Sequence, residues 1–181
     1  MLTREALVDA LKKYHSPYKE EQNFRGAFLT LLAHPQAFHR DHLPGHITGS
    51  AFIIDRERKF TLLTHHATLN RWLQPGGHAD GEENVVAVAT REAMEETGLA
   101  SVNLAMEAVF DIDIHPIPAR GGFPQHDHYD IRFLFYASRN EKLVISSESH
   151  DLAWKPLIEI AAISGNNPSM VRMADKIGSL F

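Results

Sequence analysis

The chain of 181 residues contains no cysteine. This absence excludes disulfide bonds, thiol nucleophiles, iron–sulfur clusters and thiolate zinc sites. Any bound metal must therefore be held by oxygen atoms or by imidazole nitrogens. The chain also lacks a long hydrophobic run, since no apolar stretch approaches the roughly 20 residues that span a bilayer. Its first residues include acids where a signal peptide would be apolar, so we expect a cytoplasmic protein that does not enter a membrane.

Positive charge is scarce as well. The formal net charge is −5 at pH 7, and the segment from Gly76 to Ala100, with six acidic residues and one arginine, accounts for all of it. A chain without a basic stripe is poorly suited to neutralise a nucleic-acid backbone, so we expect no nucleic-acid partner. The acidic segment would repel phosphate groups too, unless cations lie between them.

The remaining composition, 44% hydrophobic and 23% charged, is typical of one globular domain, with or without an appended segment. Apolar spacing predicts alternating helices and strands, which indicates an α/β fold. We expect helices at 3–15, 18–34, 84–97, 156–165 and 168–181, and strands at 47–54, 60–64, 72–77, 102–114, 128–137 and 151–154. The charged turn at 55–59 predicts a β-hairpin. Residues 1–45 form a helical extension in this interpretation, packed on the core that residues 46–181 build.

Three glutamates share one face of the predicted helix at 84–97. On a helical wheel, Glu92, Glu95 and Glu96 lie in one sector, and the apolar stripe of the preceding turns runs directly into them. Like charges at this spacing are destabilising, and a divalent cation removes the conflict. Carboxylate ligands with open positions suit Mg²⁺ or Mn²⁺. The alternative is a solvated acidic face paired with basic side chains, although only Arg91 lies nearby in the sequence.

The residues around this helix match a known pattern. After Gly77 come Glu83 and the run Arg91-Glu92-Ala93-Met94-Glu95-Glu96-Thr97-Gly98-Leu99. This segment resembles the Nudix box, G-x5-E-x7-R-E-U-x-E-E-x-G-U, in which U is a bulky aliphatic residue. Every fixed position is present, and the one departure is the smaller Ala93 at the first U position.

Resemblance to Nudix hydrolases implies an α/β/α sandwich with a mixed sheet, here with an N-terminal helical extension. It implies an enzyme that hydrolyses a diphosphate linkage in a nucleoside diphosphate derivative or a related organic diphosphate, with Mg²⁺ or Mn²⁺ as the cofactor. The family's metal ligands, carried over by position, are the carboxylates of Glu92, Glu95 and Glu96 and the carbonyl of Gly76. Arg91 then orients carboxylates, and Glu83 is expected to pair with the same network without being a ligand.

The group that accepts the proton from water is left open. The family takes this base either from the box or from a later loop, so the alternatives are Glu92, Glu148 and Asp151. We favour a carboxylate of the box, because the helix fixes its distance from the metal.

A polar face is predicted on the strand that starts near residue 126. Strand alternation places His126, His128, Asp130 and Arg132 on that face. We expect Arg132 and His128 to contact the phosphates of the substrate. The alternatives are a metal held by His128 and Asp130, a solvated face, or a buried hydrogen bond between the two residue types.

The histidines are numerous, twelve in all. We assign no shared role to the group His65, His66, His78, His126 and His128. Without cysteine, and without closely spaced histidines on a helix, the sequence gives weak support to a structural zinc site.

Two other functions compete with hydrolysis. A Nudix-fold module that senses a nucleotide without turnover is the main alternative, and the complete glutamate set argues against it. An isomerase of isoprenoid diphosphates would need a catalytic cysteine, which this chain lacks. We expect a small-molecule diphosphate as the partner, and a helical extension that covers a sheet edge, narrows substrate entry or forms a homodimer contact.

Overall fold

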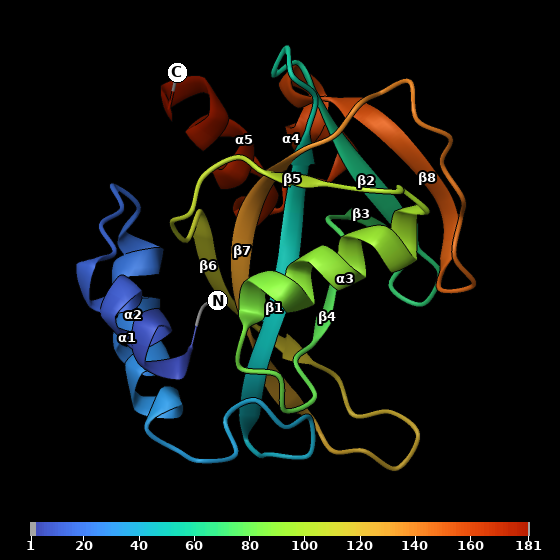
Figure 1. The fold of residues 1–181 in the computed structure, drawn as a ribbon. Helices are drawn as coiled ribbons and strands as arrows, with labels where there is room; N and C mark the ends of the chain where they lie inside the picture. The colour runs from blue at the N-terminus through green and yellow to red at the C-terminus, as the bar shows by residue number, and fades with distance from the viewer. Residues whose placement is uncertain (1–2, 181) are drawn as a thin grey trace. The chain divides into compact units, whose positions relative to one another are not determined.

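The structure, a computed structural model, describes residues 3–180 and divides into two compact units. The first unit comprises residues up to 50, 76–89 and 107–133, and the second comprises 51–75, 90–106 and the residues from 134 on. Three elements contribute residues to both units: strand β1 (Gly45–Ile54), helix α3 (Val85–Thr97) and strand β7 (His126–Tyr136). Figure 1 follows the chain through these elements.

The strands form a sheet in which the order β3-β2-β1-β7-β5 is hydrogen-bonded. In the first unit, β4 (Gly76–His78) pairs antiparallel with β1, and β6 (Asp111–Ile117) pairs antiparallel with β7. In the second unit, β2 (Phe60–His66) pairs antiparallel with β1, β3 (Arg71–Leu73) and β8 (Ser149–Pro156), and β5 (Asn103–Leu104) pairs with the end of β7. The chain ends with the 3₁₀-helix η1 (Leu157–Glu159) and the helices α4 (Ile160–Ile163) and α5 (Pro168–Leu180).

These elements confirm the predicted α/β class, including the N-terminal helices, the hairpin around residues 55–59 and the glutamate helix. The prediction of one strand over 102–114 was wrong. Leu104 pairs with Phe135 of β7, and Asp111 pairs with Arg132 of the same strand. Only residues 133 and 134 of β7 lie between these two partners, so residues 105–110 cannot all pair with β7. The strand is therefore interrupted between β5 and β6. Within residues 3–180, no helix combines the length and the apolar character needed to cross a membrane.

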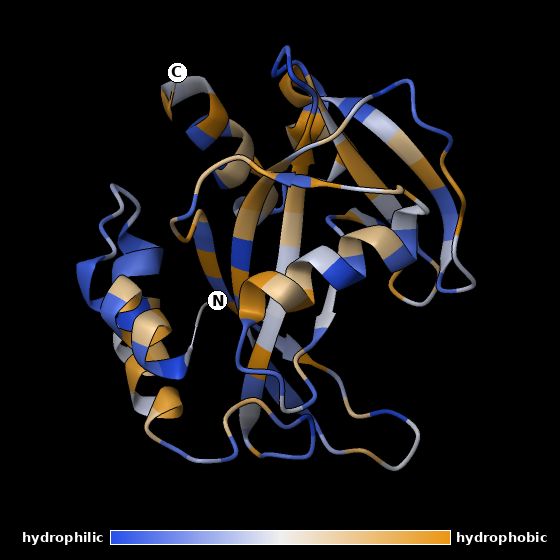
Figure 2. Ribbon diagram, in the orientation of Figure 1, coloured by the Kyte–Doolittle hydropathy of each residue, from blue (hydrophilic) through white to orange (hydrophobic). Residues whose placement is uncertain are grey.

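The N-terminal helices bury one side each within the first unit. Helix α1 (Arg4–Lys13) begins where the Thr3 hydroxyl accepts a hydrogen bond from the Ala6 N–H at 3.3 Å. Helix α2 (Lys19–Leu32) lies beside it (Figure 1), and both helices interleave hydrophilic and hydrophobic residues (Figure 2). The ring of Phe28 on α2 meets that of Tyr129 on β7 edge-on, with centroids 5.3 Å apart.

A buried carboxylate fastens α2 to β6. Glu21 is fully buried, and its oxygens accept hydrogen bonds from the hydroxyls of Tyr14, at 2.6 Å, and Ser16. The backbone N–H of Ile112 donates to the same carboxylate at 3.1 Å. Because a buried carboxylate that lost these donors would carry a large desolvation cost, the position of α2 on β6 is strongly specified.

Arg4 fastens α1 in a similar way. Its Nε donates to Oε1 of Glu83 at 2.9 Å, and its Nη atoms donate to the carbonyls of His34 and Pro35 at 3.1 and 2.8 Å. Glu83, the first glutamate of the box-like segment, is therefore paired with the N-terminal helix. Both helices of the predicted extension are bonded to later parts of the first unit, and the boundary at residue 45 stays a prediction.

Helix α3 begins directly on strand β1. Val85 and Val88 of α3 are buried against Gly49, which lies in the middle of β1. A Cβ added at Gly49 would lie 2.8 Å from Cγ1 of Val85 and 3.0 Å from the Val85 carbonyl oxygen. Glycine is therefore required by the close approach of helix and strand.

Replacing Gly49 by alanine should destabilise the protein by about 1–3 kcal/mol, because the new methyl group overpacks this contact. The matched control is Gly26→Ala in the interior of α2, where a Cβ meets nothing within 4 Å. That change should stabilise the protein by about 0.5–1 kcal/mol, because alanine is the better helix former. Urea unfolding of both variants measures the two signs, and a Gly49→Ala variant as stable as the parent would contradict the packing described.

Candidate active site on helix α3

The helix that carries the three glutamates has defined ends. The Asn84 side chain accepts from the Ala87 N–H at 3.4 Å at its start, and the Gly98 N–H donates to the Met94 carbonyl at 2.9 Å at its end. Gly98 has φ of +69°, the conformation that commonly follows the last turn of a helix. Val144 then donates its N–H to the Thr97 carbonyl at 2.9 Å, so a later segment secures the helix end.

The three glutamates differ in their exposure. The Glu92 side chain is 14% exposed and that of Glu95 is 58% exposed, whereas Glu96 is buried. Arg91 lies beside two of them, with its Nη1 at 2.8 Å from Oε1 of Glu92 and at 3.1 Å from Oε2 of Glu95. Ala93, the small residue at a position where the box has a bulky one, is fully buried. The three carboxylates on the helix therefore range from solvent-exposed, at Glu95, to buried, at Glu96.

This placement makes a charge on Glu92 costly. Burial raises the pKa of the Glu92 carboxyl, Arg91 opposes that effect, and Glu95 and Glu148 raise the pKa further. A divalent cation held by these carboxylates would offset both the burial and the mutual repulsion. The oxygen-only donor set of the three glutamates fits a hard ion such as Mg²⁺ or Mn²⁺.

Of the three alternatives for the base, Glu92 and Glu148 are neighbours in the second unit, since the charge of Glu148 acts on the Glu92 carboxyl. The segment of Glu148 is tied to the end of β2 by a hydrogen bond of 2.9 Å from the Ala67 N–H to the Glu148 carbonyl. Asp151 is exposed on β8, and its Oδ1 accepts from the Leu152 N–H at 2.8 Å. The identity of the base stays a prediction.

The side chains at the paired ends of β2 and β3 make local contacts. The Nδ1 atom of His66 accepts from the N–H groups of Thr68 and Leu69, each at 3.2 Å, and so stabilises a turn. The ring of His65 lies 5.0 Å from that of Trp72, and the ammonium of Lys155 lies 3.8 Å from the Trp72 ring centroid.

Gly76 lies on β4 opposite Ser50 of β1. A Cβ at Gly76 would clash with the Ser50 side chain, which explains the glycine. The predicted role of its carbonyl as a metal ligand stays a prediction.

Arg132 does not have the environment of a substrate-binding residue. Its side chain is 3% exposed and lies within 2.7–3.1 Å of three carboxylates, those of Asp111, Asp113 and Asp130. Burial opposes the charge of the guanidinium, but the three aspartates together hold the pKa of Arg132 above its ordinary value. This geometry disfavours the prediction that Arg132 clamps a phosphate, because its donors are directed at protein carboxylates. A contact between Arg132 and the substrate stays a prediction.

Asp130 belongs to the same buried network. Its Oδ1 accepts from the hydroxyls of Thr48, at 3.0 Å, and Ser50, at 2.7 Å, both on β1. Asp130 is thus committed to β1 and to Arg132, so the alternative in which it ligates a metal together with His128 is not favoured.

His128 instead joins three other histidines in the first unit. The ligand atoms of this group, hereafter the histidine cluster, lie within 4.8 Å of one another, and its members are His46, His78, His126 and His128. Sequence reasoning grouped three of them but missed His46. The signal that was available is the alternation of His46, Thr48 and Ser50 on β1, a polar face that matches the polar face of β7.

Comparison with known proteins identifies the domain. Residues 45–176 match the family model described as NUDIX domain. A curated relative from Xenopus laevis, nucleoside diphosphate-linked moiety X motif 6, is 32% identical over 95 residues, which cover 49% of this chain and 42% of the relative. The chain therefore spans less than half the length of that relative.

Solved structures share the fold. Similar structures include an Ap4A hydrolase from C. elegans, with a TM-score of 0.59, 18% identity and coverage of 74% of this chain and 96% of that one. A hydrolase of the NUDIX family from Clostridium perfringens has a TM-score of 0.58 and 22% identity, with coverage of 75% of this chain and 98% of that one. The MutT protein from Methanosarcina mazei has a TM-score of 0.60 and 17% identity, with coverage of 76% of this chain and 95% of that one. At these identities the likeness establishes the fold alone.

Replacing Arg132 by leucine should lower the free energy of unfolding by about 3–5 kcal/mol, because the aspartates around it would lose their cation while buried. The control is Arg120→Leu on an exposed loop, which should change stability by less than about 0.5 kcal/mol. Urea unfolding gives both values. An Arg132→Leu variant of unchanged stability would return Arg132 to the set of residues free to bind a substrate.

Proposed function

The chain belongs to the NUDIX domain family, and on that premise we propose that it is a hydrolase of a diphosphate linkage in a nucleoside diphosphate derivative or a related organic diphosphate. The observation that carries the proposal is the set of three glutamates on one face of α3, two of them largely buried and two bridged by Arg91. The relatives named as hydrolases support the reaction class. The substrate is a small molecule in this proposal.

We assign the metal-binding role to the glutamates and the carbonyl of Gly76, with Mg²⁺ or Mn²⁺ as the ion. When bound, such an ion neutralises phosphate oxygens and lowers the pKa of a coordinated water. Arg91 positions Glu92 and Glu95 and does not meet the substrate, since its guanidinium lies between their carboxylates. The chain's own contribution is a prearranged set of oxygen donors that carries more negative charge than its one arginine balances.

Glu92 is the proposed proton acceptor. Its side chain is only 14% exposed. Burial raises the pKa of the carboxyl, and a raised pKa makes a carboxylate a stronger base. Arg91 holds its Oε1 at 2.8 Å and so limits the rotation of the side chain. Glu148 and Asp151 are the alternative bases, and the charge of Glu148 acts on Glu92.

The remaining parts of the proposal concern the whole chain. We propose that residues 1–45 are a helical extension packed on the domain of residues 46–181, which the contacts of Arg4 and Glu21 support. A homodimer contact through this extension and a cytoplasmic location complete the proposal.

Replacing Glu92 by glutamine should separate metal binding from folding. Because the pKa of Glu92 is raised in the folded state, its contribution to stability is present at low pH, where the carboxyl is protonated, and is lost as the pH rises through that pKa. Glutamine stays neutral at pH 7. The Glu92→Gln variant should therefore have the same melting temperature as the parent at pH 7, or a higher one. The parent should gain about 5–10 °C at a Mg²⁺ concentration near 100 times its Kd, and the variant should gain far less. Thermal melts with and without Mg²⁺, with the exposed Glu57→Gln as the control, test this.

The activity itself is tested by a phosphate-release screen. Nucleoside triphosphates, ADP-ribose, nucleotide sugars, dinucleotides, NADH and coenzyme A would be incubated with the protein, Mg²⁺ or Mn²⁺, and a phosphatase that acts only on terminal phosphates, so that the phosphomonoester products release phosphate. Glu96→Gln and Glu57→Gln variants would be assayed in parallel. We expect metal-dependent turnover that falls at least about 100-fold in Glu96→Gln and is unchanged in Glu57→Gln. Nucleotide binding without any product would favour the sensing module instead, and full activity of Glu96→Gln would refute the proposed site.

A further inference from the structure

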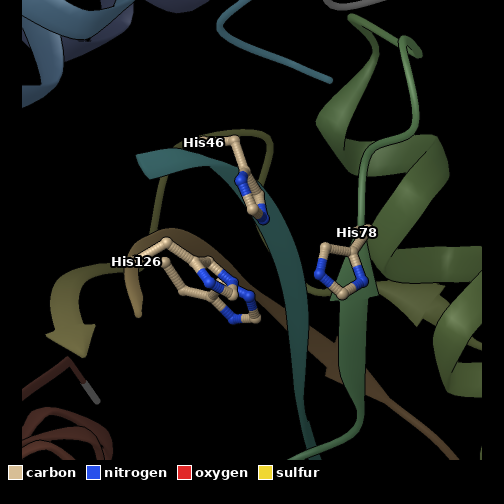
Figure 3. A group of neighbouring side chains, drawn as sticks. His46, His78 and His126 are labelled. Atoms are coloured by element: carbon tan, nitrogen blue, oxygen red, sulfur yellow. The ribbon is translucent and has the colours of Figure 1, made fainter. Parts of the chain in front are cut away.

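The histidine cluster gathers side chains from three strands. His46 lies at the start of β1, His78 ends β4, and β7 supplies His126 and His128. The pairing of Thr48 with His78 places β4 against β1, and Figure 3 shows the rings of His46, His78 and His126 pointing into the same space from their separate strands. Ring centroids of neighbouring members lie 4.9–5.3 Å apart.

In two histidines of the cluster, a backbone carbonyl next to the ring indicates which ring nitrogen carries the proton and which can bind a metal. The Nδ1 atom of His46 lies 3.3 Å from the carbonyl of His42, and the Nδ1 atom of His126 lies 3.0 Å from that of Pro124. A carbonyl oxygen only accepts, so each Nδ1 must carry the proton, and each neutral ring then has a lone pair on Nε2. A metal-bound histidine typically donates its other N–H to a carbonyl in this way.

Two ring nitrogens of the cluster are shielded from water. Nε2 of His46 and Nε2 of His128 are buried and have no hydrogen-bond partner within residues 3–180. His46 is fully buried and His126 is 8% exposed. Buried nitrogens without a donor are costly in a folded protein, and a bound cation would remove that cost.

The rings are also held in the form that binds metals. Burial lowers the pKa of His46, that of His78 to about 4 and that of His128 to about 2, and the other members of the cluster lower these values further. The lowered pKa values of these three histidines favour the neutral imidazole, which binds a metal without first releasing a proton.

The spacing requires little rearrangement. Four nitrogens at about 2.0–2.1 Å from a tetrahedral zinc ion lie about 3.3 Å from one another, and the ligand atoms of the cluster already lie within 4.8 Å. His78 and His128 are half-buried, so part of the cluster lies near the protein surface. A donor set of imidazoles alone suits Zn²⁺ and its neighbours in the transition series, not Mg²⁺.

We infer that the histidine cluster is a binding site for one divalent transition-metal ion, with Zn²⁺ as the ion that its donor set of four imidazole nitrogens fits best. The site goes beyond the proposed hydrolysis and uses none of the glutamates of α3. Its bound ion would fasten β1, β4 and β7 to one another within the first unit, at strands that are far apart in the sequence.

Zinc itself is the probe of the first experiment. The full chain, stripped of metal with a chelator, would be titrated with Zn²⁺ in competition with a chromophoric chelator, in a Glu92→Gln/Glu96→Gln background that removes carboxylate sites. We expect one zinc ion per chain, a rise in Tm of about 5–10 °C at 100 times Kd, and X-ray absorption that reports nitrogen ligands at about 2.0–2.1 Å.

The matched variants remove two histidines each. His78→Gln/His128→Gln deletes half of the cluster, and His15→Gln/His150→Gln deletes two exposed histidines outside it. Zinc affinity should fall about 100-fold or more in the first double variant and stay unchanged in the second. Equal affinity in both variants, or an oxygen-dominated absorption spectrum of the unmutated cluster, would overturn the inference, and the spectrum decides even if the first variant fails to fold. Hydrolysis plays no part in these readouts, so the proposed function stands or falls separately.

Discussion

The burial of charged and polar groups along strand β7 is the constraint on which the first unit depends. The face that carries Asp130 and Arg132 is turned inward, so each group on it needs a partner from another strand. Arg132 receives aspartates from β6, and Asp130 receives hydroxyls from β1. A one-residue slip of β7 would move this set to the other face and leave its partners alone in the interior. Register is thus fixed by polar contacts as much as by hydrophobic packing.

The same principle explains how the glutamate helix is held. Its first turn packs on β1 through Gly49, where contact is so close that no side chain fits. Its last turns carry carboxylates whose charges are only partly balanced by Arg91. Tight apolar packing at one end therefore supports an electrostatically unfavourable cluster at the other. Packing of this kind allows a folded protein to keep a cluster of carboxylates whose repulsion a metal ion would relieve.

Local signals in the sequence were sufficient for the helix, its glycine terminus and the hairpin, because each depends on residues close together in the chain. Long-range pairing was not predictable in the same way. The alternation from residue 126 predicted a polar face, but alternation alone does not distinguish a solvated polar face from a buried one. The burial of Arg132 among aspartates was therefore not predicted. Glu83 was expected to pair with the glutamate network, whereas its partner Arg4 lies 79 residues earlier. His46 was missed because the alternation on its own strand marks a polar face but does not show which strands lie beside it; β4 and β7 are placed there by the strand order.

Two donor sets of different chemistry follow from this arrangement. Helix α3 offers carboxylate oxygens, which suit a hard ion that keeps its waters and exchanges phosphate ligands readily. The histidine cluster offers imidazole nitrogens from strands that the sheet already holds in place, which suit an ion that keeps a closed tetrahedral shell. An ion of the first kind gains little from nitrogen ligands, and an ion of the second kind loses its preferred donors on the helix. The chemistry of the donors therefore provides a means of discriminating between two metals in one chain without any difference in charge between the ions.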